Sequence, residues 1–312
     1  MIIISKDQPV VIGVDTGYGN IKTANTCFPT GVTAWDTEPT FKNDLLVYEG
    51  RNYTIGSGHK EYSADKIGDN DFYLLTLAAI SRELNIRGMT EAKVFLGAGL
   101  PLTWVGKQED EFKAYLLRNE CADYTFRGKP YHVEFAGAEI FPQGFAAVAN
   151  KLHTFRGTNI LCDIGNGTMN ILSIENGKPN PAKCYTEKFG TYQCTLAAKE
   201  ALQQKLGKTV DEPIIEDVLR RGTADISESV LNVIRESTKQ YVAEIMRRLR
   251  EHGYDPELMQ LYVMGGGSCL VKNFAEYDSK RVTINGDICA TAKGYEQLAA
   301  RQLVGKTGGG AK

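Results

Sequence analysis

Apolar residues along this chain form short runs in some segments and recur every three or four positions in others. Short runs that end in turn-forming residues predict strands, and the three-to-four spacing predicts amphipathic helices. In the first half, the predicted strands are residues 10–15, 21–25, 45–48, 53–55 and 93–96, and a further strand in "YHVEFAGAEIF" that ends at Pro142. The turns "EGRN" (residues 49–52) and, in the second half, "ENGK" (residues 175–178) predict hairpins. The predicted helices are residues 73–86, residues 107–118 and a helix that begins near Gln143, directly after Pro142.

The second half follows the same logic. Its predicted strands are residues 159–163, 169–174 and 259–264, and its predicted helices are residues 191–206, 212–221, 227–252 and 287–304. Gly253 follows the longest of these helices, where a left-handed cap is expected. Strands followed by helices in both halves predict a mixed α/β protein of two similar domains.

The domain boundaries follow from this order. We expect a first domain at residues 1–155, a second at residues 156–286, a C-terminal helix at 287–304 that returns to the first domain, and a flexible tail at 305–312.

The two halves share one motif. "VIGVDTGYGNIK" (residues 11–22) and "ILCDIGNGTMNIL" (residues 160–172) both read as an apolar strand, an aspartate, a glycine-containing turn and a second strand. The aspartates, Asp15 and Asp163, lie 148 residues apart, about half the chain. An internal duplication of one domain is the simplest explanation.

Such turns have a definite chemistry. Glycine leaves backbone amides exposed, and successive amides form a concave anion site. Two such loops facing each other across a cleft would hold a polyphosphate from both sides. Asp15 and Asp163 would repel bare phosphate, so they predict a magnesium ion with its waters between carboxylate and phosphate. Lys22 would add a positive charge near the β- or γ-phosphate.

The alternative is that these turns are ordinary hairpin connections. One Asp-x-Gly turn alone is more often structural than functional. Two copies, followed by Gly265, Gly266 and Gly267 after a later strand, favour the phosphate cleft.

Other nucleotide motifs fail. The "GKT" at residues 305–307 imitates a P-loop, but the required earlier glycine is Ala300 and no strand precedes it. The triple glycine does not match a Gly-x-Gly-x-x-Gly fingerprint, because Leu270 occupies the last position.

Composition narrows the function further. The 312 residues carry a formal net charge of −2, so direct binding of nucleic acid or of an anionic membrane is not expected. The four histidines show no metal-ligand spacing, so a zinc site is not expected. The seven cysteines contain no Cys-x-x-Cys pair, which favours a protein of a reducing compartment. The apolar N-terminal stretch is too short for a signal peptide, so we expect a cytoplasmic protein.

The segments "VDTGYGNIK", "LGAGLPL", "FPQGFAA", "LCDIGNGTMNI" and "VMGGGS" together resemble the actin-like ATPases, and most of all the bacterial ParM (StbA) group that segregates plasmids. The resemblance extends from about Val11 to Leu303. It implies an α/β fold of two duplicated actin-like (ribonuclease H-like) domains around a nucleotide cleft.

The resemblance also implies roles for residues. It assigns catalysis to Gln143, which would orient the attacking water, and to Asp163. Many ParM proteins carry glutamate where this chain has Gln143; glutamine is a poor base but still holds water in line. From the residues alone, Gln143 is nearly as well explained as a polar helix-start residue. The resemblance assigns metal contacts through water to Asp15 and Asp163. It assigns nucleotide contacts to Asp15, Thr16, Gly17, Tyr18, Gly19, Asn20, Lys22, Gly165, Asn166, Gly167, Thr168, Gly265, Gly266 and Gly267.

The expected function is therefore an ATPase that forms nucleotide-dependent filaments, with ATP and Mg²⁺ as ligands and GTP left open. The family implies plasmid partition through an adaptor protein bound to centromere-like DNA. A small-molecule kinase and a non-hydrolysing nucleotide-binding regulator stay open as alternatives. Glu139 and Glu187 are further acidic candidates near the cleft, and both are expected to be ordinary solvated or ion-paired residues.

Overall fold

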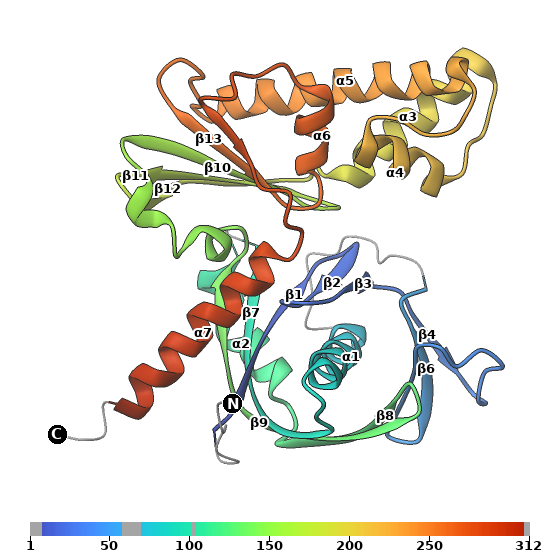
Figure 1. The fold of residues 1–312 in the computed structure, drawn as a ribbon, viewed down its shortest axis with the longest axis vertical. Coiled ribbons are helices and arrows are strands. Elements are labelled where there is room, and N and C mark those ends of the chain that lie inside the picture. The colour runs from blue at the N-terminus through green and yellow to red at the C-terminus, as the bar shows by residue number, and fades with distance from the viewer. Residues whose placement is uncertain (1–7, 58–69, 102–103, 309–312) are drawn as a thin grey trace. The chain divides into compact units, whose positions relative to one another are not determined.

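The computed structural model describes residues 8–57, 70–101 and 104–308 of the chain (Figure 1). The chain divides into two compact units. The first contains Met1–Asn150 and Cys289–Lys312, and the second contains Lys151–Ile288. The apolar N-terminal stretch (residues 1–7), His59 and residues 309–312 of the expected tail lie outside the described residues.

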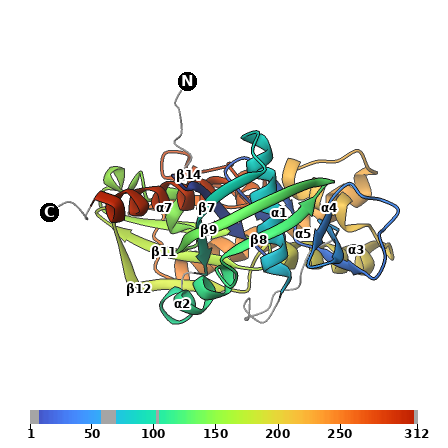
Figure 2. The same cartoon turned by 90° about the horizontal axis from the view of Figure 1, so that it is seen from below.

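Within its described residues, the first unit holds a nine-stranded sheet in the order β3-β2-β1-β7-β9-β8-β5-β6-β4. Figure 2 shows β9 running between β7 and β8. The strands are β1 (Val10–Thr16), β2 (Asn20–Lys22), β3 (Cys27–Pro29), β4 (Val32–Trp35), β5 (Leu45–Tyr48), β6 (Arg51–Ile55), β7 (Glu91–Leu100), β8 (Cys121–Phe126) and β9 (Lys129–Pro142).

Helices cover both faces of this sheet. The helix α1 (Asp71–Ile86) lies inside the curve of the sheet, whereas α7 (Ala290–Gly308) runs along its other face, next to β1 and β7 (Figure 1). Alternation along β7 explains the two faces: Val94, Leu96 and Ala98 point into the core around α1, and Phe95 points to the cluster that contains α7. The helix α2 (Val105–Leu116) packs near β9.

The second unit holds a five-stranded sheet, among its described residues, in the order β12-β11-β10-β13-β14. A core of apolar side chains lies between this sheet and its helices. The strands are β10 (Thr158–Ile164), β11 (Met169–Glu175), β12 (Lys178–Glu187), β13 (Gln260–Met264) and β14 (Val282–Ile284), and the helices are α3 (Thr191–Leu206), α4 (Glu212–Arg221), α5 (Glu228–Glu251) and α6 (Ser268–Phe274).

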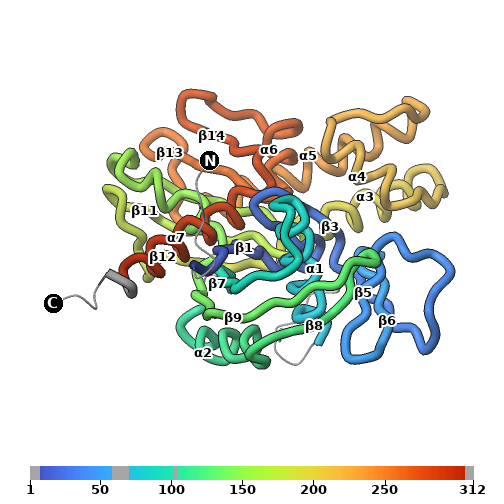
Figure 3. The backbone as a smooth tube through the Cα atoms, turned by 60° about the horizontal axis from the view of Figure 1, so that its bottom comes forward, coloured from blue at the N-terminus to red at the C-terminus, as the bar shows by residue number. Residues whose placement is uncertain are grey.

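The two sheets repeat one arrangement. In the first unit, β3, β2 and β1 are antiparallel neighbours, and β1, β7 and β9 are parallel neighbours. In the second unit, β12, β11 and β10 are antiparallel, and β10, β13 and β14 are parallel. The predicted α/β fold of two duplicated domains is confirmed. Figure 3 traces the chain from β14 into α7, which belongs to the first unit.

Two predicted hairpin turns are confirmed in detail. Glu49-Gly50 joins β5 to β6, and Asn176-Gly177 joins β11 to β12, with positive φ at all four residues. Turns of two residues with positive φ match the twist of the flanking strands. Gly253 has a φ of +88°, as its position after the longest helix predicted.

Several predictions of local structure are wrong. Residues 23–25 do not continue β2, which ends at Lys22, whereas β7 runs on through the glycines to Leu100. No α-helix begins at Gln143: a turn with Gly144 at φ +77° leads into the short 3₁₀ helices η1 (Phe145–Val148) and η2 (Leu152–Thr154). The expected tail is helical up to Gly308, so the "GKT" lies within α7.

Candidate functional site

The first candidate loop is the tip of the β1–β2 hairpin, residues 17–19. Across the strands, Asp15 pairs with Lys22 and Thr16 with Ile21. A Cβ on Gly17 would lie 2.8 Å from the carbonyl oxygen of Asn20, so no side chain fits there. The hydroxyl of Thr30 donates to the carbonyl oxygen of Tyr18 at 2.6 Å and is fully buried, so it fixes the tip from below. Sequence reasoning missed Thr30.

Asp15 and Lys22 form a largely buried ion pair. The Lys22 Nζ lies 3.0 Å from Asp15 Oδ2, and the two side chains are 15% and 9% exposed. The same ammonium lies beside Gly17 of the tip. Because an unpaired charge in a largely buried position is costly, each partner holds the other in place at the loop. Lys22 therefore lies at the first loop, and the role of Lys22 toward phosphate stays a prediction.

Tyr18 contributes backbone, but its side chain belongs to the core. The ring is 8% exposed and meets Phe72 of α1 edge-on, with 5.7 Å between ring centroids. The side chain therefore anchors the tip on α1, while the peptide groups of the tip remain the part that is suited to an anion.

Gln143 lies at the same edge of the sheet as Asp15. The strands β1, β7 and β9 are parallel neighbours, and their registers place Ile140 level with Ala98 and Ala98 level with Val14. Asp15 therefore follows one residue after Val14 at the carboxyl edge, and Gln143 follows three residues after Ile140. The Gln143 amide donates to the Leu100 carbonyl at 2.9 Å, which holds this turn against the end of β7.

The second candidate loop is the tip of the β10–β11 hairpin, residues 165–168. Asp163 pairs across the strands with Asn170, at the position where Asp15 pairs with Lys22 in the first unit. The amide of Gly165 donates to the Thr168 carbonyl at 2.8 Å and closes the tip. The second loop therefore repeats the aspartate and the glycines of the first without a lysine at the matching position.

The N-terminus of α3 supports this second loop. The amides of Thr191 and Tyr192 donate to the carbonyl oxygens of Gly165 and Asn166 at 3.0 and 2.9 Å. A Cβ on Gly190 would lie 2.8 Å from the carbonyl oxygen of Gly165, so the helix approaches the loop this closely only because residue 190 is glycine. Sequence reasoning missed Gly190 and Thr191; the glycine directly before a helical pattern was the available signal.

The triple glycine after β13 packs on the same strand end. Gly265 has a φ of +84°, and a Cβ there would collide with Asp163 and lie 2.5 Å from the Ile164 carbonyl oxygen. The Gly267 amide donates to that carbonyl at 2.8 Å. Around Gly266 the space is open. The second unit thus brings together Asp163, the second loop and the triple glycine, and their role in one nucleotide site stays a prediction.

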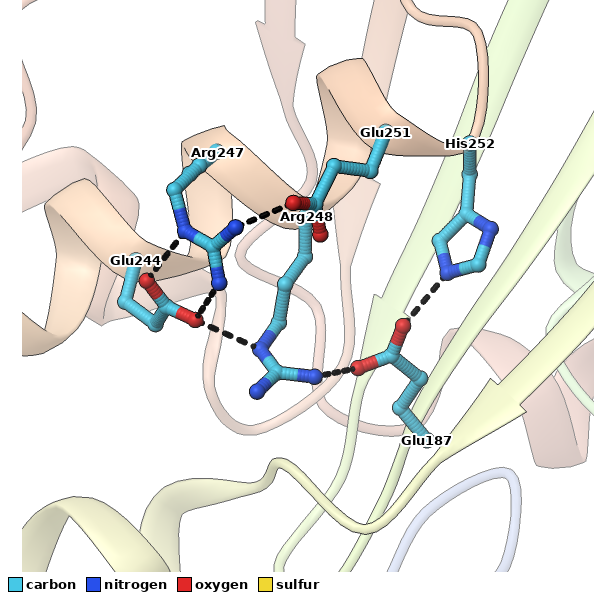
Figure 4. Close-up of polar contacts among 6 residues, drawn as sticks. All are labelled: Glu187, Glu244, Arg247, Arg248, Glu251 and His252. Carbon is cyan, nitrogen blue, oxygen red and sulfur yellow. Dashed lines mark hydrogen bonds and ion pairs between the residues drawn. The ribbon is translucent and has the colours of Figure 1, made fainter.

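Glu139 and Glu187 are ion-paired, as expected. Glu139 lies 3.4 Å from Lys113 of α2. Glu187 accepts hydrogen bonds from Arg248 and His252 (Figure 4). Burial alone would raise the pKa of Glu187, but these hydrogen bonds lower it below its ordinary value. A carboxylate held in this way is a structural anchor and a poor general base.

A cavity of about 260 Å³ lies at the other end of the second sheet. Its lining includes Thr158, Ser173, Lys183 and His252, and it contains no residue of either candidate loop. Ser173 is buried, and its hydroxyl has no hydrogen-bond partner among the residues that the structure describes.

The candidate residues include several oxygen donors. Their oxygen donors, the Asp15 and Asp163 carboxylates and the Thr168 hydroxyl, are ligands that Mg²⁺ prefers. In the part of the chain that the structure describes, no three His, Cys, Asp or Glu side chains gather as a metal site. The same part contains no helix whose length and apolar character would let it span a membrane.

Two family models match the chain. The model of the actin-like proteins' N-terminal domain matches residues 13–145, and that of the C-terminal domain of the archaeal MreB-like actin homologue matches residues 161–276. The chain belongs to the actin-like proteins. The resemblance stated from the sequence motifs is thereby confirmed. No curated protein sequence matches the chain.

Solved actin-like structures share the fold of this actin-like chain over nearly its whole length. The archaeal actin homologue Ta0583, in complex with ADP, has a TM-score of 0.73 at 20% identity, over 94% of this chain and 99% of that one. ParM of Bacillus thuringiensis with ATP has a TM-score of 0.69 at 12% identity, over 95% and 99%. The Alp12 filament structure has a TM-score of 0.67 at 17% identity, over 94% and 98%. ParM is thus among the proteins of similar fold.

Proposed function

We propose that this actin-like protein is an ATPase whose nucleotide state controls its assembly into filaments. One observation carries the proposal: the same hairpin, with an aspartate at the strand end and glycines at the tip, occurs at the same position in two sheets. The five strands of the second sheet repeat the arrangement of five strands of the first. A duplicated anion-binding tip suits a ligand with several phosphates. Family membership and the nucleotides in the similar structures support this choice.

In this proposal, the backbone amides of both tips bind phosphate oxygens. Lys22 neutralises the phosphates next to the first tip, and Thr168 adds a hydroxyl at the second. Bound Mg²⁺ would neutralise phosphate charge and polarise the γ-phosphate. Asp15 and Asp163 would orient its water ligands. The open space at Gly266 suits the adenosine end, because no side chain fills it.

Gln143 is proposed to hold the attacking water. It follows the carboxyl edge that also carries Asp15, and its backbone is fixed on Leu100. A glutamine side chain offers one acceptor and two donors, enough to orient water but too weakly basic to remove its proton. Slow hydrolysis is therefore expected.

The cellular role is proposed from the family alone. We infer a cytoplasmic filament that moves plasmid DNA through an adaptor protein on a centromere-like site. The net charge of −2 fits a protein that contacts DNA only through that adaptor. The similarity to a ParM protein and to an Alp12 filament supports self-association.

One alternative has a specific observation in its favour. Gln143 in place of an acidic residue suits a nucleotide-binding regulator that does not hydrolyse ATP. No residue of the described chain favours a small-molecule kinase in the same way, and turnover that requires a sugar or an acid would be its mark.

Phosphate release from Mg·ATP and Mg·GTP tests the proposal, with binding measured in parallel by calorimetry. We expect slow release by the wild type. Asp163→Ala should weaken binding and abolish release, whereas Gln143→Ala should bind ATP normally and release phosphate at least about tenfold more slowly. Tight binding without release in the wild type would support the regulator instead. Absence of binding would overturn the proposal.

A further inference from the structure

The C-terminal half of α5 contacts residues 188–190, the linker between β12 and α3. The Tyr241 hydroxyl donates to the Gly190 carbonyl at 2.8 Å. Its ring stacks on Phe189, with 4.2 Å between ring centroids and planes 4° apart. Tyr241 is only 9% exposed, so hydrogen bond and stacking together fix two successive residues of the linker.

A second set of contacts holds the start of the linker (Figure 4). Glu187, the last residue of β12, accepts hydrogen bonds from Arg248 and His252 of the same helix end. The Arg248 guanidinium also lies over the Phe189 ring, 4.5 Å from its centroid. Glu244 in turn forms an ion pair with Arg248, with 3.0 Å between Glu244 Oε1 and Arg248 Nε. The helix therefore restrains the chain from Glu187 through Gly190.

The far end of this segment leads directly to the second loop. Gly190 precedes Thr191 and Tyr192, whose amides donate to the loop carbonyls of Gly165 and Asn166. The Thr191 hydroxyl also lies 3.1 Å from Asn166 Oδ1. Because Gly190 packs against the loop with no room for a methyl group, a shift of its peptide would move the loop itself.

We infer that Tyr241 is a positioning residue for the second loop, with Glu187 and Arg248 as its outer support. This inference rests on the proposed function, because the loop is proposed to bind phosphate. Tyr241 acts through the linker: it fixes the Gly190 carbonyl, and through it the two α3 amides that hold Gly165 and Asn166. The phosphate end of a nucleotide should therefore respond to Tyr241, and the nucleoside end should not.

The test uses Tyr241→Phe, which removes the hydroxyl and keeps the ring on Phe189. Tyr254→Phe is the matched control, since Tyr254 is a buried tyrosine of the same core, three residues after the end of α5. Calorimetry with Mg·ATP and with AMP separates the two ends of the ligand. Tyr241→Phe should weaken ATP binding about three- to tenfold, the value of one hydrogen bond, and leave AMP binding unchanged. Tyr254→Phe should change neither affinity.

Hydrogen exchange in the absence of nucleotide provides a readout that does not depend on the proposed function. Tyr241→Phe should speed exchange at the Thr191 and Tyr192 amides, whereas the Val263 amide in β13 should exchange as in the wild type. The double variant Tyr241→Phe/Glu187→Gln should lose less ATP affinity than the product of the fold losses of the two single variants, because both residues act on one linker.

The outcomes are distinct. If the wild type fails to bind ATP, the proposed function is wrong, and the exchange rates still decide whether Tyr241 holds the α3 amides. If the wild type binds ATP and Tyr241→Phe changes neither the ATP-to-AMP ratio nor the exchange at Thr191 and Tyr192, the inference is overturned. Equal losses for ATP and AMP would also overturn it, since they would indicate general destabilisation.

Discussion

Gly265 and Gly266 are neighbours with opposite requirements. At Gly265 the backbone has a φ of +84°, and a Cβ would collide with Asp163; at Gly266 no atom lies within 4 Å of the added Cβ. A positive φ with a methyl group in a filled space strains the backbone by about 1–3 kcal/mol. The requirement for glycine is therefore specific to one of the two positions.

This difference gives the first prediction. Gly265→Ala should lower the free energy of unfolding of the chain by about 2 kcal/mol and displace Asp163. Gly266→Ala should leave stability within about 0.5 kcal/mol of the wild type, because the site is open. Urea denaturation followed by circular dichroism measures both. Equal stability of the two variants would contradict the geometry at Gly265.

A partly buried carboxyl beside β1 gives a pH prediction. The Glu296 Oε2 atom of α7 accepts a hydrogen bond from the Gly13 amide at 3.2 Å, and its Oε1 atom lies 3.6 Å from the Arg87 guanidinium. Burial raises the pKa of Glu296 above its ordinary value of 4.5, and the Gly13 amide and Arg87 offset this only in part. Since the folded chain keeps this proton at a pH where the unfolded chain has lost it, the group stabilises the fold at low pH. That contribution is lost as pH rises through the raised pKa.

Glu296→Gln should therefore lose less stability than the wild type as pH rises from 4.5 to 7. The amide oxygen of glutamine can still accept from Gly13, so the contact survives while the titration is removed. Urea midpoints at both pH values, for both proteins, measure this difference. Parallel pH profiles would show that Glu296 does not titrate abnormally in the folded chain.

At the scale of elements, the close packing of α7 on the first sheet requires a strand residue without a side chain. Gly97 of β7 faces this helix, and a Cβ there would lie 2.6 Å from the Tyr295 carbonyl oxygen. Phe141 stacks on Tyr295 with 6.1 Å between ring centroids. Close packing of helix on strand therefore requires glycine at a position where strand propensity favours a β-branched residue.

Gly97→Ala should push α7 away from the sheet. We expect a loss of about 1–3 kcal/mol in stability and faster hydrogen exchange along α7. Gly106→Ala is the control, because Gly106 lies in α2 with open space around it, where alanine is neutral or stabilises by up to about 1 kcal/mol. Slow, wild-type exchange in α7 of Gly97→Ala would mean that the helix tolerates the methyl group.

Helices and turns were predicted correctly where one local sequence pattern was clear. The prediction failed where a backbone contact with another strand determined the local structure. The helical spacing of α5 and the two Asn-Gly or Glu-Gly turns were sufficient by themselves. The helix expected at Gln143 is replaced by a turn because Gly144 takes a positive φ and the Gln143 amide bonds Leu100. That partner lies on another strand, 43 residues earlier, so no local pattern could reveal it.

At the scale of the whole molecule, the proposal predicts that the nucleotide controls assembly. ATP with Mg²⁺ should raise light scattering and produce pelletable polymer. The polymer should disassemble as ATP is consumed but persist with AMPPNP, whose γ-phosphate is not removed. Asp163→Ala should not assemble. Polymer of equal lifetime with ATP and AMPPNP would contradict a role for hydrolysis in disassembly.

The sequence by itself determined the duplicated hairpin, the glycines at its tips and the mixed α/β fold. These features are written in local patterns: apolar alternation, turn residues with positive φ, and a motif repeated at half the chain length. Membership of the actin-like proteins could be stated from the same motifs.

Only the tertiary structure decided which residues support the loops. Thr30 lies under the first tip, Tyr241 holds the linker to the second, and Glu187 at the end of β12 is held by Arg248 of α5. Tyr18 turned out to be a core side chain because α1 presents Phe72 to it. These contacts join residues 12 to 61 positions apart, and hydrogen bonds and packing at such separations leave no periodic trace in a single sequence.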